Sequence, residues 1–233
     1  MSEKEHTTAE SVHWGYTGDC GPEYWGKLCP EFQLSSTGKN QSPINLTGIV
    51  KADLAPLQFD YQAGGVEICN NGHSVQVNVA PGSTLNAAGY VYELKQYHFH
   101  VPSENHINGQ PFPMESHLVH MDSDGNIAVV AVMYVTGPAN PALSQAWAHM
   151  PETVGCTYTL NPAVPVTDLL PENRAYYRFN GSLTTPPCTE GVCWFVMKAP
   201  VTVSQAQIDY FARVMGVPNN RPLQPLNARV VLG

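Results

Sequence analysis

Two short stretches decide the fold, QYHFH at residues 96–100 and ESHLVH at residues 115–120. Both alternate polar and apolar residues with the period of two that is typical of β-strands. Side chains at positions i and i+2 of a strand share a face, so His98 lies beside His100, and Glu115 beside His117. If the two strands are neighbours in one sheet, three imidazoles converge. Three histidines on rigid strands, with a fourth position open, are the pattern of a catalytic zinc site.

The same strands supply groups that can hold these histidines in place. Gln96 precedes His98 by two residues, and Glu115 precedes His117 by two residues, each on the same face as its histidine. A metal-bound histidine normally donates its second N–H to such a group. His120 faces away from His117, so we interpret it as a packed core histidine. A site without a carboxylate ligand leaves Zn²⁺ its full double charge, which acidifies a bound water strongly.

Composition limits the class of protein. The chain has 233 residues, 43% of them hydrophobic, with a formal net charge of −8. This length suits one sizeable β domain, which we place at residues 13–233 after a flexible N-terminal arm at residues 1–12. An acidic chain is unsuited to nucleic acid. No apolar run approaches ~18 residues, so no membrane span is predicted. Met1 to Ser11 is polar, so we expect no signal peptide in this chain.

The hydrophobic pattern predicts many short strands. Val75 to Val79 alternates after the tight-turn signal Asn-Asn-Gly at residues 70–72. Ile127 to Val135 is almost continuously apolar, which predicts a central strand buried on both faces. Trp194 to Met197 is a further apolar run of this kind.

Helices are predicted to be few. The best candidate is Val203 to Met215, where Ser204 and Gln207 form a capping box and Gly216 follows the last turn. A shorter helix is predicted at residues 144–150. Together the elements predict a mainly β domain built on one large sheet with a few short peripheral helices.

Six cysteines, with none of the spacings of a zinc ribbon or a redox Cys-x-x-Cys, suggest an oxidising compartment. Two of them, Cys69 and Cys193, are interpreted as small buried residues on strands. The pairing of six cysteines cannot be deduced from sequence, so the connectivity stays open.

The chain resembles the α-class carbonic anhydrases of bacterial type. The resemblance runs in order through seven segments, at residues 13–16, 40–44, 70–73, 96–104, 115–120, 181–188 and 219–226. It implies a large central mixed, mostly antiparallel sheet. It also implies zinc-dependent, reversible hydration of carbon dioxide to bicarbonate and a proton, through attack by a zinc-bound hydroxide.

The resemblance assigns roles at the centre of the site. It makes His98, His100 and His117 the zinc ligands. It makes Thr184 the hydroxyl that accepts a hydrogen bond from the zinc hydroxide and donates one to Glu104. Without the resemblance, Thr184 would be an ordinary strand end and Glu104 a surface carboxylate.

The resemblance also assigns the substrate pocket. Carbon dioxide is small and apolar, so an apolar pocket beside the zinc can hold it without competing water. Thr185 lies on the polar side of the pocket, where bicarbonate would bind. The apolar wall, which would otherwise be read as plain core, consists of Val119, Val129, Leu183, Val192 and Trp194.

By the same resemblance, His73 is the proton shuttle, since an imidazole with a pKa near 6.5 can relay a proton to buffer. The alternative is an exposed turn histidine without this role. Three polar residues would order the intervening waters, namely Tyr16, Asn71 and Gln76. Asn219 would support the ligand histidines together with Gln96 and Glu115.

The chain departs from the bacterial pattern at a disulfide. Bacterial relatives usually pair the cysteine at the position of Cys188 with one just before the Gly-Lys-Asn-Gln-Ser-Pro segment. Here either Ser35 or Ser36 stands at that position, and Cys29, a few residues upstream, could substitute through a shifted loop. The resemblance and the cysteine count together suggest a periplasmic or secreted protein, and the resemblance suggests a homodimer.

Two other functions are compatible with parts of this pattern. A non-catalytic binding member of the family would lack one or more of the zinc histidines, and all three are present. A different zinc hydrolase, such as an esterase, would use the same nucleophile. A narrow pocket walled by Val119 and Val129 should restrict esters to a minor side activity.

Overall fold

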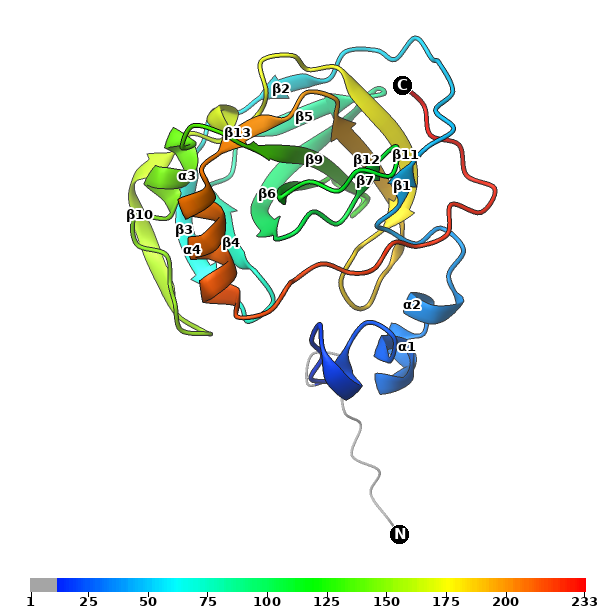
Figure 1. The fold of residues 1–233 in the computed structure, drawn as a ribbon. Helices are drawn as coiled ribbons and strands as arrows, with labels where there is room; N and C mark the ends of the chain where they lie inside the picture. Colours follow the sequence, from blue (N-terminus) through cyan, green and yellow to red (C-terminus); the bar gives the residue numbers. More distant parts are fainter. Residues whose placement is uncertain (1–11) are drawn as a thin grey trace.

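The computed structural model describes residues 12–233, so the predicted arm at residues 1–12 lies almost wholly outside the described residues. The described chain is mainly β with a few short helices, as predicted (Figure 1). The strands are β1 (Asn45–Leu46), β2 (Gln58–Asp60), β3 (Gly65–Asn70), β4 (Val75–Val79), β5 (Thr84–Ala87), β6 (Tyr90–His100), β7 (His106–Ile107), β8 (Met114–Met121), β9 (Ile127–Thr136), β10 (Thr157–Val164), β11 (Tyr176–Ser182), β12 (Glu190–Met197) and β13 (Val201–Val203). The α-helices are α1 (Trp25–Leu28), α2 (Leu34–Thr37), α3 (Pro141–Ala146) and α4 (Gln205–Met215), and short 3₁₀ turns lie at Gly18–Cys20, Pro30–Phe32 and Val166–Leu169.

One large sheet organises the described residues. Its main strand order is β10-β3-β4-β6-β8-β9-β12-β11, with β5 and β2 continuing from β6 and β13 pairing with β9. β9 runs parallel to β12 and β13, and the other ladders of this sheet are antiparallel. The sheet is therefore mixed and mostly antiparallel, as the resemblance implied. β1 and β7 form a separate parallel pair.

β9 confirms the prediction of a central strand buried on both faces. Its residues from Ala128 to Tyr134 are all buried. Alternate side chains enter two different hydrophobic clusters, so that Val130 and Val132 pack on one face of the sheet while Val129 and Ala131 pack on the other. A strand covered on both faces has no polar side, which is why its sequence shows a continuous apolar run.

The larger cluster lies on the face that α3 and α4 cover. There Phe99 of β6 packs edge-to-face on Trp147, with ring centroids 5.0 Å apart, and Trp147 stacks on Phe211 of α4 at 5.6 Å. Aromatic contacts of this kind add about 0.5–1.5 kcal/mol beyond their buried area. They fix the back of the strand that carries His98 and His100.

Helix α4 has the predicted caps. The Ser204 hydroxyl accepts a hydrogen bond from the backbone N–H of Gln207, and the Gln207 side chain accepts one from the backbone N–H of Ser204. Gly216 ends the helix in the left-handed conformation, at φ 72°. The first four N–H groups of a helix have no partner within the helix. The capping box of Ser204 and Gln207 provides such partners, and for this reason it marks the start of α4.

The shorter helix was predicted too late in the chain. It was expected at residues 144–150 and instead spans Pro141–Ala146. Asn140 caps it by accepting a hydrogen bond from the backbone N–H of Leu143, and Pro141 occupies the first turn, where its missing N–H costs nothing. The Asn-Pro pair was therefore the start signal.

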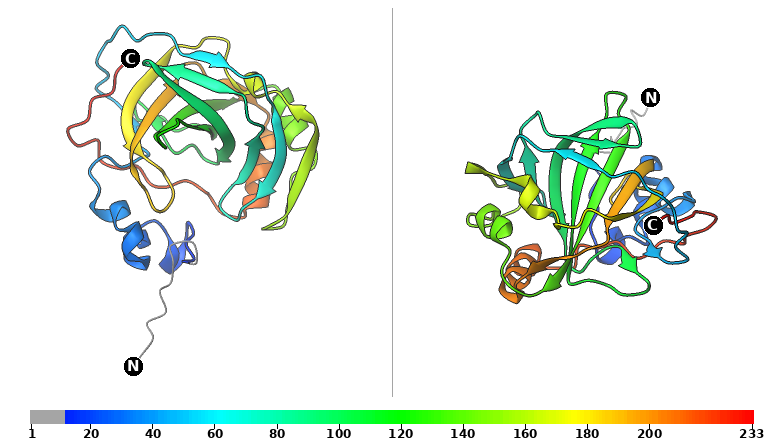
Figure 2. Two further views of the ribbon diagram at one scale, coloured as in Figure 1. Left: turned by 180° about the vertical axis from the view of Figure 1, so that it is seen from behind. Right: turned by 90° about the horizontal axis from the view of Figure 1, so that it is seen from above.

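The segment after α4 crosses the molecule to the side on which α1 and α2 lie (Figures 1 and 2). Along this path Asn219 donates a backbone hydrogen bond to the carbonyl of Val101, Gln224 to that of Pro43, and Gly233 to that of Val50. The C-terminal segment thus connects the strand with the histidines to the N-terminal part of the chain. None of the helices in residues 12–233 is long and apolar enough to span a membrane.

Candidate metal centre

β6 and β8 are antiparallel neighbours, as the first prediction required. In their register His98 lies opposite His117, and His100 lies opposite Glu115. The three imidazoles have ring centroids 4.6–5.4 Å apart. One ring nitrogen from each histidine lies within 4.8 Å of the others, which is close enough for a single ion to contact all three.

Hydrogen bonds fix two of the three rings. His98 Nδ1 lies 2.8 Å from Gln96 Oε1, and His117 Nε2 lies 2.9 Å from Glu115 Oε1. Both partners were predicted from the i and i+2 spacing. Each bond places the ring proton on the bonded nitrogen and leaves the other nitrogen free to bind a metal.

The third ring is held from a distant part of the sequence. His100 Nδ1 lies 2.7 Å from the backbone carbonyl oxygen of Asn219. The Asn219 side chain accepts a hydrogen bond from the backbone N–H of Val101 at 2.9 Å and donates to the carbonyls of Phe99 and His73, at 2.9 and 3.1 Å. The predicted support by Asn219 therefore comes through its main chain, with its side chain joining β6 to the turn that carries His73.

The donor set fits a transition-metal cation. Burial lowers the pKa of His98 and His117 well below the usual value and lowers that of His100, so all three imidazoles are neutral. Neutral imidazole is the form that binds metal. His100 Nε2 is buried without a hydrogen-bond partner, and a bound cation would satisfy it.

Glu115 is itself held firmly. Its Oε2 accepts hydrogen bonds from the backbone N–H groups of Glu104 and Asn105, at 2.7 and 2.8 Å, and its Oε1 accepts one from Asn105 Nδ2 at 2.7 Å. Burial raises the pKa of Glu115, and these hydrogen bonds act in the opposite direction. The contribution of Asn105 was not predicted, although its position directly after Glu104 made it a candidate.

Glu104 lies against the metal centre. Its Oε1 accepts a hydrogen bond from the backbone N–H of Arg221 at 2.8 Å, and its Oε2 lies 3.5 Å from His100 Nε2. Burial raises the pKa of Glu104 to about 8, against the Arg221 N–H and a contact with the buried Thr184 hydroxyl. A cation at the histidines would favour the ionised carboxylate.

The predicted apolar wall is one group beside the histidines. Val119, Val129 and Trp194 lie in register on β8, β9 and β12. The Trp194 ring is 4.9 Å from that of His117. Val192 is buried in the same cluster, and Leu183 packs against it.

The predicted polar residues lie on the opposite flank. Gln76 of β4 is in register with His98 and donates to Asn78 Oδ1 at 2.7 Å. Asn71 uses its side-chain oxygen to accept hydrogen bonds from the backbone N–H groups of His73 and Ser74, which closes the turn. Its contribution to the site is thus partly structural.

His73 is half-buried and stacks on Trp14, with ring centroids 3.5 Å apart and planes 8° apart. Burial lowers its pKa, and His13 lowers it further. The Trp14 contact was not predicted. The Tyr16 hydroxyl is buried without a partner, and burial raises its pKa well above the usual value. Thr185 is half-buried, and its carbonyl accepts a hydrogen bond from the backbone N–H of Cys188.

His120 has the predicted structural role. It is fully buried on the other face of β8, where Nε2 lies 2.6 Å from the Tyr61 hydroxyl and Nδ1 lies 3.3 Å from the carbonyl of Ala128. Both ring nitrogens are thus engaged. Burial lowers its pKa to about 4.

The six cysteines are all free in the structure. The structure therefore has no Cys29–Cys188 bond, and Cys188 is buried in the segment that carries Thr184. Burial raises the pKa of Cys188 to about 12, which makes its thiol unreactive. Cys69 and Cys193 lie on strands β3 and β12 as predicted, but they are half-buried.

Three imidazoles on neighbouring strands of one large sheet, with those of His100 and His117 buried and that of His98 half-buried, form a His₃ group that can hold a metal ion. The family model of the eukaryotic-type carbonic anhydrases matches residues 20–233. The chain therefore belongs to the carbonic anhydrase family and is an enzyme of that family.

Individual relatives agree. A carbonic anhydrase of Neisseria gonorrhoeae is 52% identical over 95% of this chain and 88% of its own length. One of Pectobacterium carotovorum is 49% identical over 97% of this chain and 93% of its own length. The solved structure of the α-carbonic anhydrase from Thermovibrio ammonificans, in complex with sulfanilamide, is 48% identical, with a TM-score of 0.94 over 95% of this chain and 99% of that chain.

Proposed function

We propose that the chain catalyses the zinc-dependent, reversible hydration of carbon dioxide to bicarbonate and a proton. The observation that carries this proposal is the set of three neutral imidazoles with converging free nitrogens, beside an apolar wall and a buried Glu104–Thr184 pair. Zinc is the proposed metal because three neutral nitrogen ligands suit it, whereas Mg²⁺ and Ca²⁺ prefer oxygen. When bound, zinc lowers the pKa of its water, to about 7 in known carbonic anhydrases.

Thr184 and Glu104 orient the attacking oxygen in this proposal. The carboxylate of Glu104 accepts a hydrogen bond from the Thr184 hydroxyl, whose oxygen can then only accept a hydrogen bond from the attacking group. That restriction turns a lone pair of the nucleophile toward the substrate carbon, which lowers the entropic part of the barrier.

The apolar wall binds carbon dioxide. Val119, Val129 and Trp194 present hydrocarbon next to the His117 ring, so a small apolar substrate displaces only weakly bound water there. Thr185, on the polar side, would hold bicarbonate. Larger substrates should fit poorly, so ester hydrolysis is proposed only as a minor side activity.

His73 exports the proton. Its imidazole is half-buried, stacks on Trp14, and stands on the polar flank with Gln76 and Tyr16. Its lowered pKa makes it a weaker base but a better donor to buffer. Asn71 is proposed to act with Tyr16 and Gln76 in ordering the waters between the metal centre and this ring.

Stopped-flow measurement of carbon dioxide hydration, with and without a zinc chelator, tests the proposal. We expect fast hydration, about one zinc per chain, and loss of activity on chelation that zinc restores. A purified, metal-loaded protein with no hydration above the buffer rate would overturn it. Faster turnover of a physiological ester than of carbon dioxide would rank the hydrolase function first.

We also propose a periplasmic or secreted location and a homodimer, on the family relationship and, for location, the cysteine count. Cell fractionation and light scattering of the purified protein test these two points.

A further inference from the structure

Arg221 is a buried cation whose partners are all neutral. Only 1% of the residue is exposed, and among residues 12–233 no carboxylate forms an ion pair with it. Its Nη1 donates to Gln41 Oε1 at 2.8 Å and to the carbonyl of Ser42 at 2.7 Å, while Nη2 donates to the carbonyl of Ser35 at 2.7 Å. The guanidinium lies 5.6 Å from the centre of the Trp25 ring. Burying such a group costs free energy that an apolar side chain would not, so stability alone does not explain it.

The main chain of the same residue holds Glu104. The backbone N–H of Arg221 donates to Glu104 Oε1 at 2.8 Å, and the other carboxylate oxygen lies 3.5 Å from His100 Nε2. A shift of residue 221 therefore shifts this carboxylate relative to the metal ligands.

The partners of the guanidinium hold the segment that carries Thr184. Gln41 donates from Nε2 to the carbonyl of Cys188 at 3.0 Å. Ser42 and Ser182 exchange two hydrogen bonds, in which each backbone N–H donates to the other hydroxyl, at 2.9 and 3.1 Å. Residues on both sides of Thr184 are thus bonded to the two residues that Nη1 binds.

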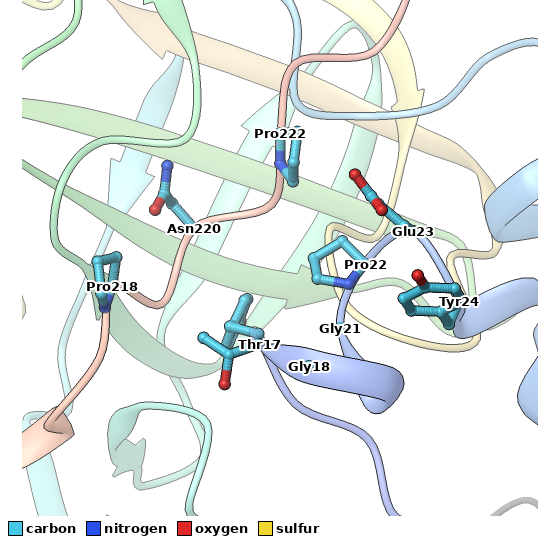
Figure 3. A pocket seen from close by; sticks show the side chains of 10 residues that line it. Thr17, Gly18, Gly21, Pro22, Glu23, Tyr24, Pro218, Asn220 and Pro222 are labelled. Atoms are coloured by element: carbon cyan, nitrogen blue, oxygen red, sulfur yellow. The ribbon is translucent and has the colours of Figure 1, made fainter.

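The outer side of the chain at residue 221 is open. Figure 3 shows a pocket between the N-terminal segment, at Thr17 and Tyr24, and the C-terminal segment, at Pro218, Asn220 and Pro222. Its volume is about 340 Å³. The residues beside Arg221 line a hollow, so the inward bonds of its guanidinium act together with those of Asn219 and Gln224 to hold this part of the chain.

We propose that Arg221 is a positioning residue for carbon dioxide hydration. Its main chain positions Glu104 and its guanidinium positions the Thr184 segment, so one residue fixes the two groups relative to each other. The inference rests on the proposed function, in which this pair orients the attacking oxygen. Misplacement of about 1 Å in such an arrangement can cost about a hundredfold in rate.

The test compares two arginines. Arg221→Lys keeps the charge but cannot reach three acceptors, because an ammonium lacks the planar fork of guanidinium. Arg229→Lys is the matched control, since Arg229 likewise donates to three oxygens, the backbone carbonyls of Leu226, Asn180 and Pro225, but bonds neither Glu104 nor Gln41. Zinc content, thermal unfolding, kcat and KM are measured for both zinc-loaded variants and the unsubstituted protein.

We expect Arg221→Lys to lower kcat about 10–100-fold at full zinc occupancy, with KM changed little because the apolar wall is untouched. Arg229→Lys should leave both constants within about twofold. In a Glu104→Gln background, Arg221→Lys should cost much less, since two residues that act through one arrangement are non-additive.

Three results would overturn the inference: activity of Arg221→Lys within twofold of the unsubstituted protein, a loss no larger than its loss of zinc, or full additivity with Glu104→Gln. If Arg221→Lys does not fold, Gln41→Leu removes the bonds of Gln41 to Arg221, Cys188 and Glu190 but keeps the Arg221 N–H on Glu104, and it must lower kcat in the same way. An inactive unsubstituted protein would instead refute the proposed function, so the two failures are distinguishable.

Discussion

His117 and His120 lie three residues apart on β8, and both are buried imidazoles with a lowered pKa. They differ in what surrounds them. His120 has both nitrogens engaged, by Tyr61 and Ala128, whereas His117 is bonded through Nε2 to Glu115 and turns its other nitrogen toward His98 and His100. On this strand, neither burial nor a lowered pKa distinguishes a candidate metal ligand from a core histidine. What distinguishes them is whether one ring nitrogen is left without a hydrogen-bond partner in the protein.

The sharpest way to break this comparison is to remove each histidine. His117→Ala should abolish zinc binding and carbon dioxide hydration, because two ligands cannot hold the ion in a tetrahedral site. His120→Gln should keep about one zinc per chain and nearly full activity, because the side chain at residue 120 lies on the face of β8 opposite to His117. Zinc analysis and stopped-flow assays check both, and stoichiometric zinc in His117→Ala would contradict the ligand assignment.

A finer comparison removes the partner of a histidine on each face. Gln96→Leu deprives His98 of its 2.8 Å hydrogen bond and should weaken zinc binding about 10–100-fold. Tyr61→Phe deprives His120 of its partner and should leave zinc affinity unchanged. Competition with a chromophoric chelator gives both affinities, and equal effects of the two substitutions would remove the distinction between the faces.

A third comparison concerns His73, a histidine that is half-buried and lies outside the group of three. His73→Ala should slow turnover on the order of tenfold to a hundredfold in weak buffer and hardly at all in strong buffer, since buffer then takes the proton directly. Added imidazole should restore the rate. An unchanged rate at low buffer concentration would mean that protons leave by another route.

The last prediction leaves activity aside and concerns the pH dependence that His120 gives to stability. Its pKa of about 4 in the folded chain lies below the ordinary value of about 6.5, so the unfolded chain takes up the proton first as pH falls. The stabilisation is complete above about pH 6.5 and is lost between about pH 6.5 and 4, by about 3 kcal/mol in all. His120→Gln should lack this loss.

Urea unfolding at pH 7 and pH 4.5 measures this loss of unfolding free energy in the unsubstituted protein and in His120→Gln. Both proteins are used without metal, so that metal release contributes nothing. Parallel curves for the two proteins would show that His120 does not titrate in this range.

The sequence predicted the faces of β6 and β8 because alternation alone assigns each side chain to a side of the sheet. It predicted both ends of α4 because the capping groups are local. It could not predict that the main chain of Asn219 holds His100, or that Arg221 joins Glu104 to Gln41, because contacts between segments more than a hundred residues apart leave no periodic signal. The start of α3 was predictable from the capping residue Asn140 and from Pro141. The prediction followed the apolar residues instead and therefore began three residues too late.

Asn219 has a consequence for what happens when the metal is lost. Its carbonyl restrains the His100 ring, and its amide restrains the carbonyl of His73. When the His100 ring is released, that restraint on the turn at residues 70–74 weakens as well. The three histidines and the turn that carries His73 therefore belong to one unit of local unfolding, so a metal ion bound at the histidines would also protect the backbone amides of the turn from hydrogen exchange.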